Sequence, residues 1–207
     1  MTIEILSQDD CQQGSPAWFE ARRGLPTTSR FSAIMAKGEG KTRASYMREL
    51  AAEIITGETG ESYVSNAMLR GKEQEDKARR TYSLITDNEI RQIGFARDLD
   101  KGAGTSTDGL IGDDGVLELK SMGADLLIDV IECGKFPGEH VWQCLGALWV
   151  LGRRWCDLAI YAPKMPLFVR RIERDPEKLA RLAKEIGVFQ VELAAMVRRV
   201  QAYGSGA

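Results

Sequence analysis

Histidine is almost absent from this sequence of 207 residues, which contains only His140. Ser-His-Asp catalysis is therefore disfavoured, because His140 would have to be the base. The four cysteines lie far apart and form no C-x-x-C pair. Neither a zinc site nor a disulfide framework is expected from such spacing.

Long apolar runs are also missing. The longest covers residues 147–151, far short of the roughly 20 residues that span a bilayer. The first residues lack the basic and apolar regions of a signal peptide, so we expect a protein of the reducing cytoplasm. The hydrophobic share of 43% and the charged share of 28% are typical of globular chains. One domain over residues 1–203, with a flexible tail at 204–207, is the simplest organisation.

Charge is distributed unevenly around a net value of -2. Residues 85–145 contain twelve acidic and five basic side chains, a net -7, which leaves +5 for the rest. This division suits an acidic, cation-binding centre flanked by basic surfaces for a polyanion. A solvated surface with charges segregated by chance is the alternative. The net acidity argues against a protein that simply coats DNA.

Hydrophobic periodicity predicts an α/β or α+β domain with a mixed sheet. Helices are expected at 15–22, 29–35, 42–56, 67–85 and 139–152, with a long terminal helix from the Asp175-Pro176 pair. Strands are expected at 89–97, 106–111, 116–120, 155–161 and 167–172.

The most informative segment joins Asp108 to Glu118 and Lys120. The two-residue period of a strand places Glu118 and Lys120 on one face, and a turn at residues 112–115 can return that strand beside Asp108. Two carboxylates about 4 Å apart repel by about 4 kcal/mol at an effective dielectric near 20, so they need a counter-charge. Mg²⁺ suits such oxygen ligands, and Lys120 could orient or deprotonate a water. An exposed strand with alternating charges is the alternative.

Two further polar residues occupy positions expected to be apolar. Glu75 shares a helical stripe with Gly71, Ala78, Tyr82 and Ile85, and a lone buried carboxylate costs several kcal/mol. An ion pair with Arg79, one helical turn away, is the alternative explanation. Gln143 lies on an otherwise apolar helix, where most glutamines simply bind backbone groups.

Read together, several segments resemble the bacteriophage lambda exonuclease family, also called YqaJ-type viral recombinases, of the PD-(D/E)XK nuclease fold. The resemblance covers most of the chain and is carried by residues 13–18, 22–24, 27–29, 71–75, 106–110, 117–120, Gln143 with Trp149, and 172–175. Thr107 stands where relatives usually have proline, and Ala147 replaces a common aromatic residue. A restriction-endonuclease-like core, a mixed central sheet flanked by helices, is implied.

The resemblance implies a Mg²⁺-dependent exonuclease that digests one strand of linear duplex DNA from its 5′ end. It would release mononucleotides and leave 3′ single strands for recombination by annealing. Asp108, Glu118 and the Leu119 carbonyl would bind the metal. Two Mg²⁺ ions are implied, and Mn²⁺ could replace them. Lys120 would position water, assisted by Glu75. The residues implied to bind the terminal 5′-phosphate are Arg22, Ser29, Ser106 and Gln143.

Family members form ring-shaped homotrimers and work with a single-strand annealing protein. The resemblance therefore implies a homotrimer and an annealing partner for this chain. It also implies a phage or prophage origin and a location in the bacterial cytoplasm. Lys37, Lys41 and Arg43 are candidate channel residues on the basis of local charge. Met68 is similar in position to a strand-separating wedge, and an ordinary core methionine is the alternative. Two other functions stay open: a PD-(D/E)XK endonuclease that cuts internal sites, and a non-catalytic protein that binds DNA ends.

Overall fold

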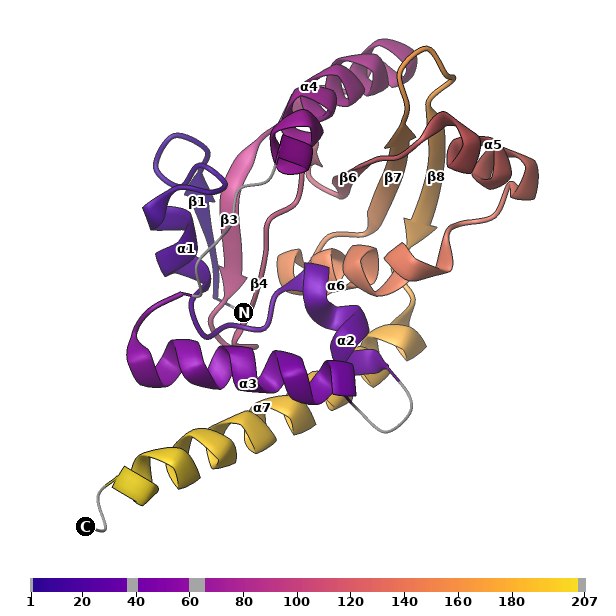
Figure 1. Cartoon of the computed structure of the whole chain (residues 1–207). Coiled ribbons are helices and arrows are strands. Elements are labelled where there is room, and N and C mark those ends of the chain that lie inside the picture. Colours follow the sequence, from indigo (N-terminus) through magenta and orange to yellow (C-terminus); the bar gives the residue numbers. More distant parts are fainter. Residues whose placement is uncertain (1, 37–40, 60–65, 205–207) are drawn as a thin grey trace.

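The fold is described by a computed structural model covering residues 2–36, 41–59 and 66–204, with the backbone alone for 66–73 (Figure 1). The helices are α1 (Pro16–Arg22), α2 (Phe31–Met35), α3 (Lys41–Thr56), α4 (Asn66–Thr86), α5 (Ala124–Cys133), α6 (Val141–Leu151), α7 (Pro176–Gly204) and the 3-10 turns η1 (Thr28–Arg30) and η2 (Gly138–His140). The strands are β1 (Ile3–Ser7), β2 (Ile90–Arg91), β3 (Ile93–Asp98), β4 (Ala103–Thr105), β5 (Gly109–Ile111), β6 (Gly115–Ser121), β7 (Trp155–Tyr161) and β8 (Phe168–Glu173).

The strands form two sheets. The larger has the order β2-β5-β6-β7-β8, and the smaller has the order β1-β3-β4. Among the strand pairs of the described residues, only β6–β7 is parallel, and the chain crosses between these strands through α5 and α6, as parallel pairing requires. The mixed sheet and the α/β class therefore agree with the sequence prediction.

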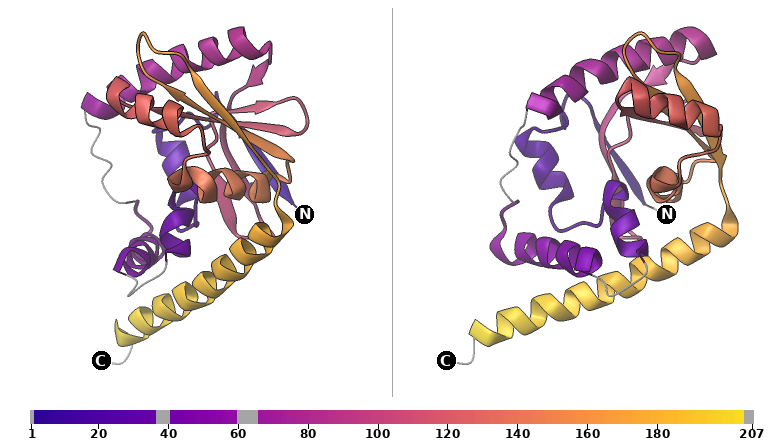
Figure 2. Two further views of the ribbon diagram at one scale, coloured as in Figure 1. Left: turned by 90° about the vertical axis from the view of Figure 1, so that its right-hand side faces the viewer. Right: turned by 45° about the vertical axis from the view of Figure 1, so that its right-hand side comes forward.

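Helices cover both faces of the larger sheet, with α4 on one side and α6 on the other (Figures 1 and 2). Ala78 and Tyr82 of α4 pack against Leu117 and Leu119 of β6. The apolar helix α6 belongs to the main core, which also contains residues of α2, α3 and α7. Successive residues of β6 thus face different helices, so Glu118 is directed toward α6.

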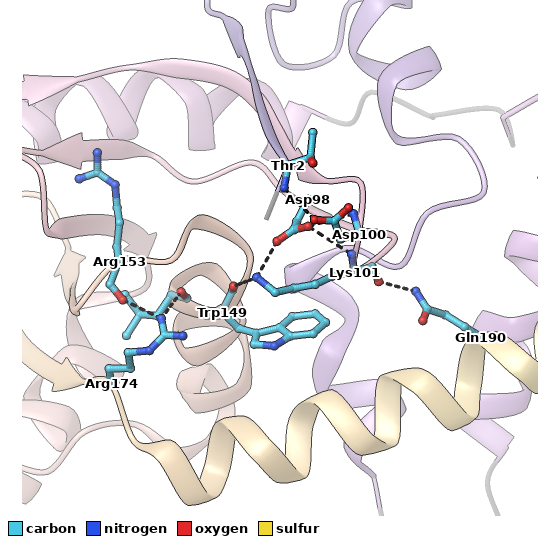
Figure 3. Close-up of polar contacts among 9 residues, drawn as sticks. Thr2, Asp98, Asp100, Lys101, Trp149, Arg153, Arg174 and Gln190 are labelled. Atoms are coloured by element: carbon cyan, nitrogen blue, oxygen red, sulfur yellow. Dashed lines mark hydrogen bonds and ion pairs between the residues drawn. The ribbon is translucent and has the colours of Figure 1, made fainter.

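The C-terminal end of α6 is held by two cations (Figure 3). Lys101 Nζ donates to the Trp149 carbonyl at 2.7 Å, and Arg174 donates to the Leu148 carbonyl at 2.8 Å. Lys101 also pairs with the fully buried Asp98 at 2.6 Å. These carbonyls lack partners within the helix, and cations stabilise the negative end of its dipole. The helix that carries Gln143 is therefore fixed at its far end.

Several elements differ from the sequence predictions. The strand expected at 89–97 is interrupted at Gln92, so β2 joins the larger sheet and β3 the smaller. Strands β1 and β4 and helix α5 were not predicted. Gly104 lies within β4, and a Cβ there would overlap the Phe95 ring. That strand therefore lacks the alternating side chains that reveal strands in a sequence.

Other predictions concern the ends of elements. Ile85 was expected on the buried stripe of the fourth helix, but its side chain is 58% exposed, so the buried stripe ends at Tyr82, which is fully buried. The expected tail at 204–207 lies outside the described residues apart from Gly204, which ends α7. None of the helices within the described ranges has the length and apolarity needed to cross a membrane.

Candidate active site

Asp108 and β6 are joined by two backbone contacts. The Asp108 N–H donates to the Leu117 carbonyl at 3.1 Å, and Asp108 Oδ2 accepts from the Leu119 N–H at 2.6 Å. The neighbouring Gly109 has to be glycine, because a Cβ there would overlap the Ile90 side chain of β2. The hairpin therefore places the Asp108 carboxylate beside Glu118, as the spacing predicted.

Glu118 is buried between the sheet and α6, with 3% of its surface exposed. Its Oε1 accepts from Lys120 Nζ at 2.7 Å and also from the Gln143 side-chain amide. Burial raises the pKa of Glu118 to about 7; Lys120 lowers it, and the nearby Asp108 and Glu75 raise it. Asp108 likewise has a pKa raised by burial. Both groups thus bind protons more readily than ordinary carboxylates.

Lys120 remains a cation in this setting. Burial acts to lower its pKa, but Glu118 and Asp108 raise it above the ordinary value of lysine. An ammonium with so high a pKa is a hydrogen-bond donor and counter-charge rather than a base. Of the two roles that the sequence left open, orienting a water or phosphate oxygen fits this arrangement better than deprotonating water.

Glu75 is half-buried on α4 and lines the same pocket as Asp108. Burial raises its pKa, and the charge of Asp108 raises it further. The ion pair with Arg79 that was the alternative explanation for Glu75 does not form. The Arg79 guanidinium donates instead to Asp76 at 2.7 Å and to the Asp108 carbonyl at 3.3 Å, so Arg79 ties α4 to the segment that carries Asp108.

A buried network fixes α4 two turns beyond Glu75. Tyr82 Oη donates to Asp157 Oδ2 at 2.6 Å, and Asp157 accepts two further bonds from Arg171, at 2.7 and 2.9 Å. Asp157 is 3% exposed and Tyr82 is fully buried. Because residues 75 and 82 lie seven positions apart on one helix face, this bond sets the rotation that directs Glu75 toward Asp108.

The four residues implied to bind a 5′-phosphate are divided between two groups. Arg22 stacks on Trp18, with its Cζ 4.0 Å from the ring centroid, and the Trp18 indole N–H donates to Ser106 Oγ at 2.8 Å. Ser29 is exposed and follows Thr28, whose hydroxyl bonds to that of Thr105 at 2.8 Å. Ser29 and Ser106 therefore flank one bonded threonine pair.

Gln143 lies apart from the other three residues, because its described hydrogen bond is to Glu118 rather than to Arg22 or Ser106. Of the candidate channel residues, Lys41 is exposed and Arg43 pairs with Glu192 of α7. Lys37 and the side chain of Met68 lie outside the described residues. Trp18 and Arg79 were not singled out as site residues, although the resemblance motif at 13–18 already contained the tryptophan.

The site has the oxygen donors that a hard divalent cation prefers. Among the described residues, no three His, Cys, Asp or Glu side chains form a complete metal cage. That donor set fits Mg²⁺, which is commonly held by one or two carboxylates together with water and substrate phosphate. Burial raises the pKa of all three carboxylates, and neighbouring carboxylates raise those of Glu118 and Glu75 further, so a bound cation would stabilise their charged forms.

The chain resembles known exonucleases in sequence and structure. The YqaJ-like viral recombinase domain family matches residues 17–154. An alkaline exonuclease (LHK-Exo) from Laribacter hongkongensis is 33% identical, with a TM-score of 0.84 over 92% of this chain and 98% of the other. Its complex with dAMP gives 34% identity, the same TM-score and the same coverage.

A phage-related exonuclease from Haemophilus somnus 129PT has a TM-score of 0.63 over 85% of this chain and 96% of its own, at 13% identity, which supports the fold alone. No curated protein sequence matches the chain significantly. The family match spans most of the chain and contains the cluster at Asp108, Glu118 and Lys120. The chain therefore belongs to the YqaJ-like viral recombinase family and is a DNA exonuclease.

Proposed function

We propose that this protein is a Mg²⁺-dependent exonuclease that digests one strand of linear duplex DNA from the 5′ end. It would release 5′-mononucleotides and leave 3′ single strands for annealing. The observation that carries this proposal is the convergence of Asp108, Glu118 and Lys120 at β6, with Glu75 lining the same pocket as Asp108. The similarity to LHK-Exo, which has been determined with dAMP bound, supports it.

Asp108, Glu118 and the Leu119 carbonyl would hold the metal, with Glu75 as an additional carboxylate. When bound, Mg²⁺ or Mn²⁺ would supply Lewis-acid polarisation of the scissile phosphate and activation of water. Lys120 would donate a hydrogen bond to the reacting phosphate group. Gln143 would keep the Glu118 carboxylate in place through its amide N–H.

The terminal 5′-phosphate would bind at Arg22 and Ser106, with Ser29 close to Ser106. A guanidinium matches the geometry of a phosphate and forms charge-assisted hydrogen bonds. Stacking on Trp18 restricts the guanidinium before the phosphate arrives. Because an internal linkage carries less charge than a terminal phosphate, such a site would favour chain ends.

The family resemblance leads us to propose a homotrimeric ring in a bacterial cytoplasm and a single-strand annealing protein as partner. A ring would retain DNA by topology, which would reconcile processive digestion with a net charge of -2. Size-exclusion chromatography with light scattering tests the trimer directly.

The decisive experiment follows an end-labelled linear duplex with Mg²⁺ and with EDTA. We expect mononucleotides from the 5′-phosphorylated strand only when Mg²⁺ is present, and slower digestion of a 5′-hydroxyl end. Closed circular plasmid is the control for an endonuclease. Linearisation of that plasmid as fast as linear duplex is shortened would contradict the proposal, as would release of label from the 3′ end first.

A further inference from the structure

The proposed function leaves one part of the substrate without a binding place, namely the base of the 5′-terminal nucleotide. Its own phosphate would lie at Ser106, and the scissile phosphate would lie at Asp108. These residues are two positions apart, so their Cα atoms are at most about 7 Å from each other. The nucleoside between the two phosphates must therefore lie beside Thr107.

A pocket of about 240 Å³ opens at this point of the structure. It is bounded by the segment after β1, by α4 and by the start of β3, and its lining residues are Gln8, Gln12, Gln13, Glu75, Asp76, Arg79, Gln92, Ile93, Thr107 and Asp108. The pocket thus reaches from the metal-binding carboxylate to the loop that precedes Trp18.

The charges around the pocket do not suit a second phosphate. Glu75 and Asp108 would hold the metal beside the scissile phosphate, and the two other charged side chains of the lining, Asp76 and Arg79, bind each other. No cation of the lining is therefore left to bind a further anion. A neutral polar group with apolar faces, such as a nucleobase, needs no such cation.

Glutamine is concentrated in this pocket. Four of the eight glutamines in the chain line it. Gln92 accepts from Arg79 at 3.2 Å when its amide oxygen faces the guanidinium. Within the described part of the chain, the side-chain amides of Gln8, Gln12 and Gln13 have no hydrogen-bond partner. Each amide carries both donors and an acceptor, so the three can match any base edge by rotating.

We propose that this pocket receives the base of the 5′-terminal nucleotide and that Gln8, Gln12 and Gln13 hydrogen-bond to its edge. The inference rests on the proposed function, because it assumes a terminal phosphate near Ser106. Adaptable amides hold each of the four bases about equally well, as an enzyme that must digest every sequence requires.

The test compares nucleotides with a ligand that lacks the base. Binding of dAMP, dGMP, dCMP, thymidine monophosphate and 2-deoxyribose 5-phosphate is measured by calorimetry in Mg²⁺. The variant is the triple substitution Gln8→Ala, Gln12→Ala and Gln13→Ala, and Gln201→Ala on α7 is the matched control. Thermal unfolding of each variant checks the fold.

We expect the triple variant to bind all four nucleotides about tenfold more weakly, with unchanged affinity for deoxyribose phosphate and no effect of Gln201→Ala. Unchanged nucleotide binding, or an equal loss for deoxyribose phosphate, would overturn the inference. Wild-type protein that binds dAMP no better than deoxyribose phosphate would also overturn it.

A different result would contradict the proposed function. Arg22→Ala should weaken deoxyribose phosphate and dAMP alike, because it removes a phosphate contact. Equal digestion rates on 5′-phosphate and 5′-hydroxyl ends, in both wild type and Arg22→Ala, would contradict the end-binding site. The comparison of ligands with and without a base would still test the role of the glutamines.

Discussion

Lys120 Nζ lies 2.7 Å from Glu118 Oε1, two residues away on the same strand. The pair is largely buried, with 28% of the lysine side chain and 4% of the glutamate side chain exposed. The β6 strand thereby holds a cation against one of the three carboxylates of the site. Lys120 balances part of their charge, and we propose that it also donates a hydrogen bond to the reacting phosphate group.

Removing Lys120 should therefore slow cleavage strongly without removing the site. We expect Lys120→Ala to lower the single-turnover rate by about 10²- to 10⁴-fold, the range typical of a positioned catalytic group. Binding of duplex DNA, followed by fluorescence anisotropy, should change little. Lys184→Ala, at an exposed position of α7, is the control and should cleave normally. A Lys120→Ala enzyme that keeps most of its rate would exclude a catalytic role.

Stability without metal should depend on pH through Glu118. Its folded pKa of about 7 exceeds the value of about 4.3 for an unperturbed glutamate, so the folded state binds more protons than the unfolded state between these values. The stability contributed by protonated Glu118 is therefore present at low pH and is lost as pH rises toward and through 7. Urea unfolding in EDTA should show wild type losing on the order of 1–3 kcal/mol relative to Glu118→Gln between pH 5 and pH 8. A constant difference would contradict the raised pKa.

Mg²⁺ should reverse this loss at the higher pH. Binding to the folded state alone raises stability by mass action, and the carboxylates must be ionised to bind. We expect Mg²⁺ to raise the melting temperature of wild type at pH 8 and much less at pH 5. Glu118→Gln should weaken the response at both values. An equal shift in wild type and in Glu118→Gln would indicate that the ion binds elsewhere.

End recognition should depend on the guanidinium of Arg22. Arg22→Ala should reduce the preference for 5′-phosphorylated over 5′-hydroxyl ends by about 10- to 100-fold, the equivalent of one or two charge-assisted hydrogen bonds. Arg22→Lys should restore only part of it, because an ammonium neither binds bidentately nor stacks on Trp18 in the same way. Initial rates on the two duplexes measure both effects. Equal preference in wild type and Arg22→Ala would place the phosphate elsewhere.

The bond between Tyr82 and Asp157 should stabilise the fold and position Glu75. Tyr82→Phe leaves the buried Asp157 with Arg171 alone and should cost about 1–3 kcal/mol of unfolding free energy. Tyr203→Phe, at a residue that is 92% exposed, is the control. If the network positions Glu75, Tyr82→Phe should also lower kcat at a temperature where the protein is fully folded, while KM for DNA stays constant. Unchanged kcat would restrict Tyr82 to stability.

Some features of the site follow from local periodicity. The alternation of a strand is enough to place Glu118 and Lys120 on one face, and the turn at 112–115 is enough to return that strand to Asp108. The helical stripe identified Glu75 as a carboxylate near the core. These conclusions hold because each depends on residues a few positions apart, where backbone geometry allows little freedom.

Long-range packing decides the remainder. The bond from Gln143 to Glu118 joins residues 25 positions apart, and it forms because α6 is fixed at its far end by Lys101 and Arg174. Local spacing also allowed Arg79 to pair with Glu75, but in the folded protein its guanidinium donates to Asp76 and to the Asp108 carbonyl instead.

Within the chain itself, the residue order determined the class of fold, the family and the acidic residues available for chemistry. Tertiary structure alone decided that the strand expected at 89–97 divides between two sheets, and that Gln8, Gln12 and Gln13 line the pocket of Asp108. The physical reason is that a side chain's partner across space depends on how whole elements pack, and packing energies are summed over many distant residues that no short pattern contains.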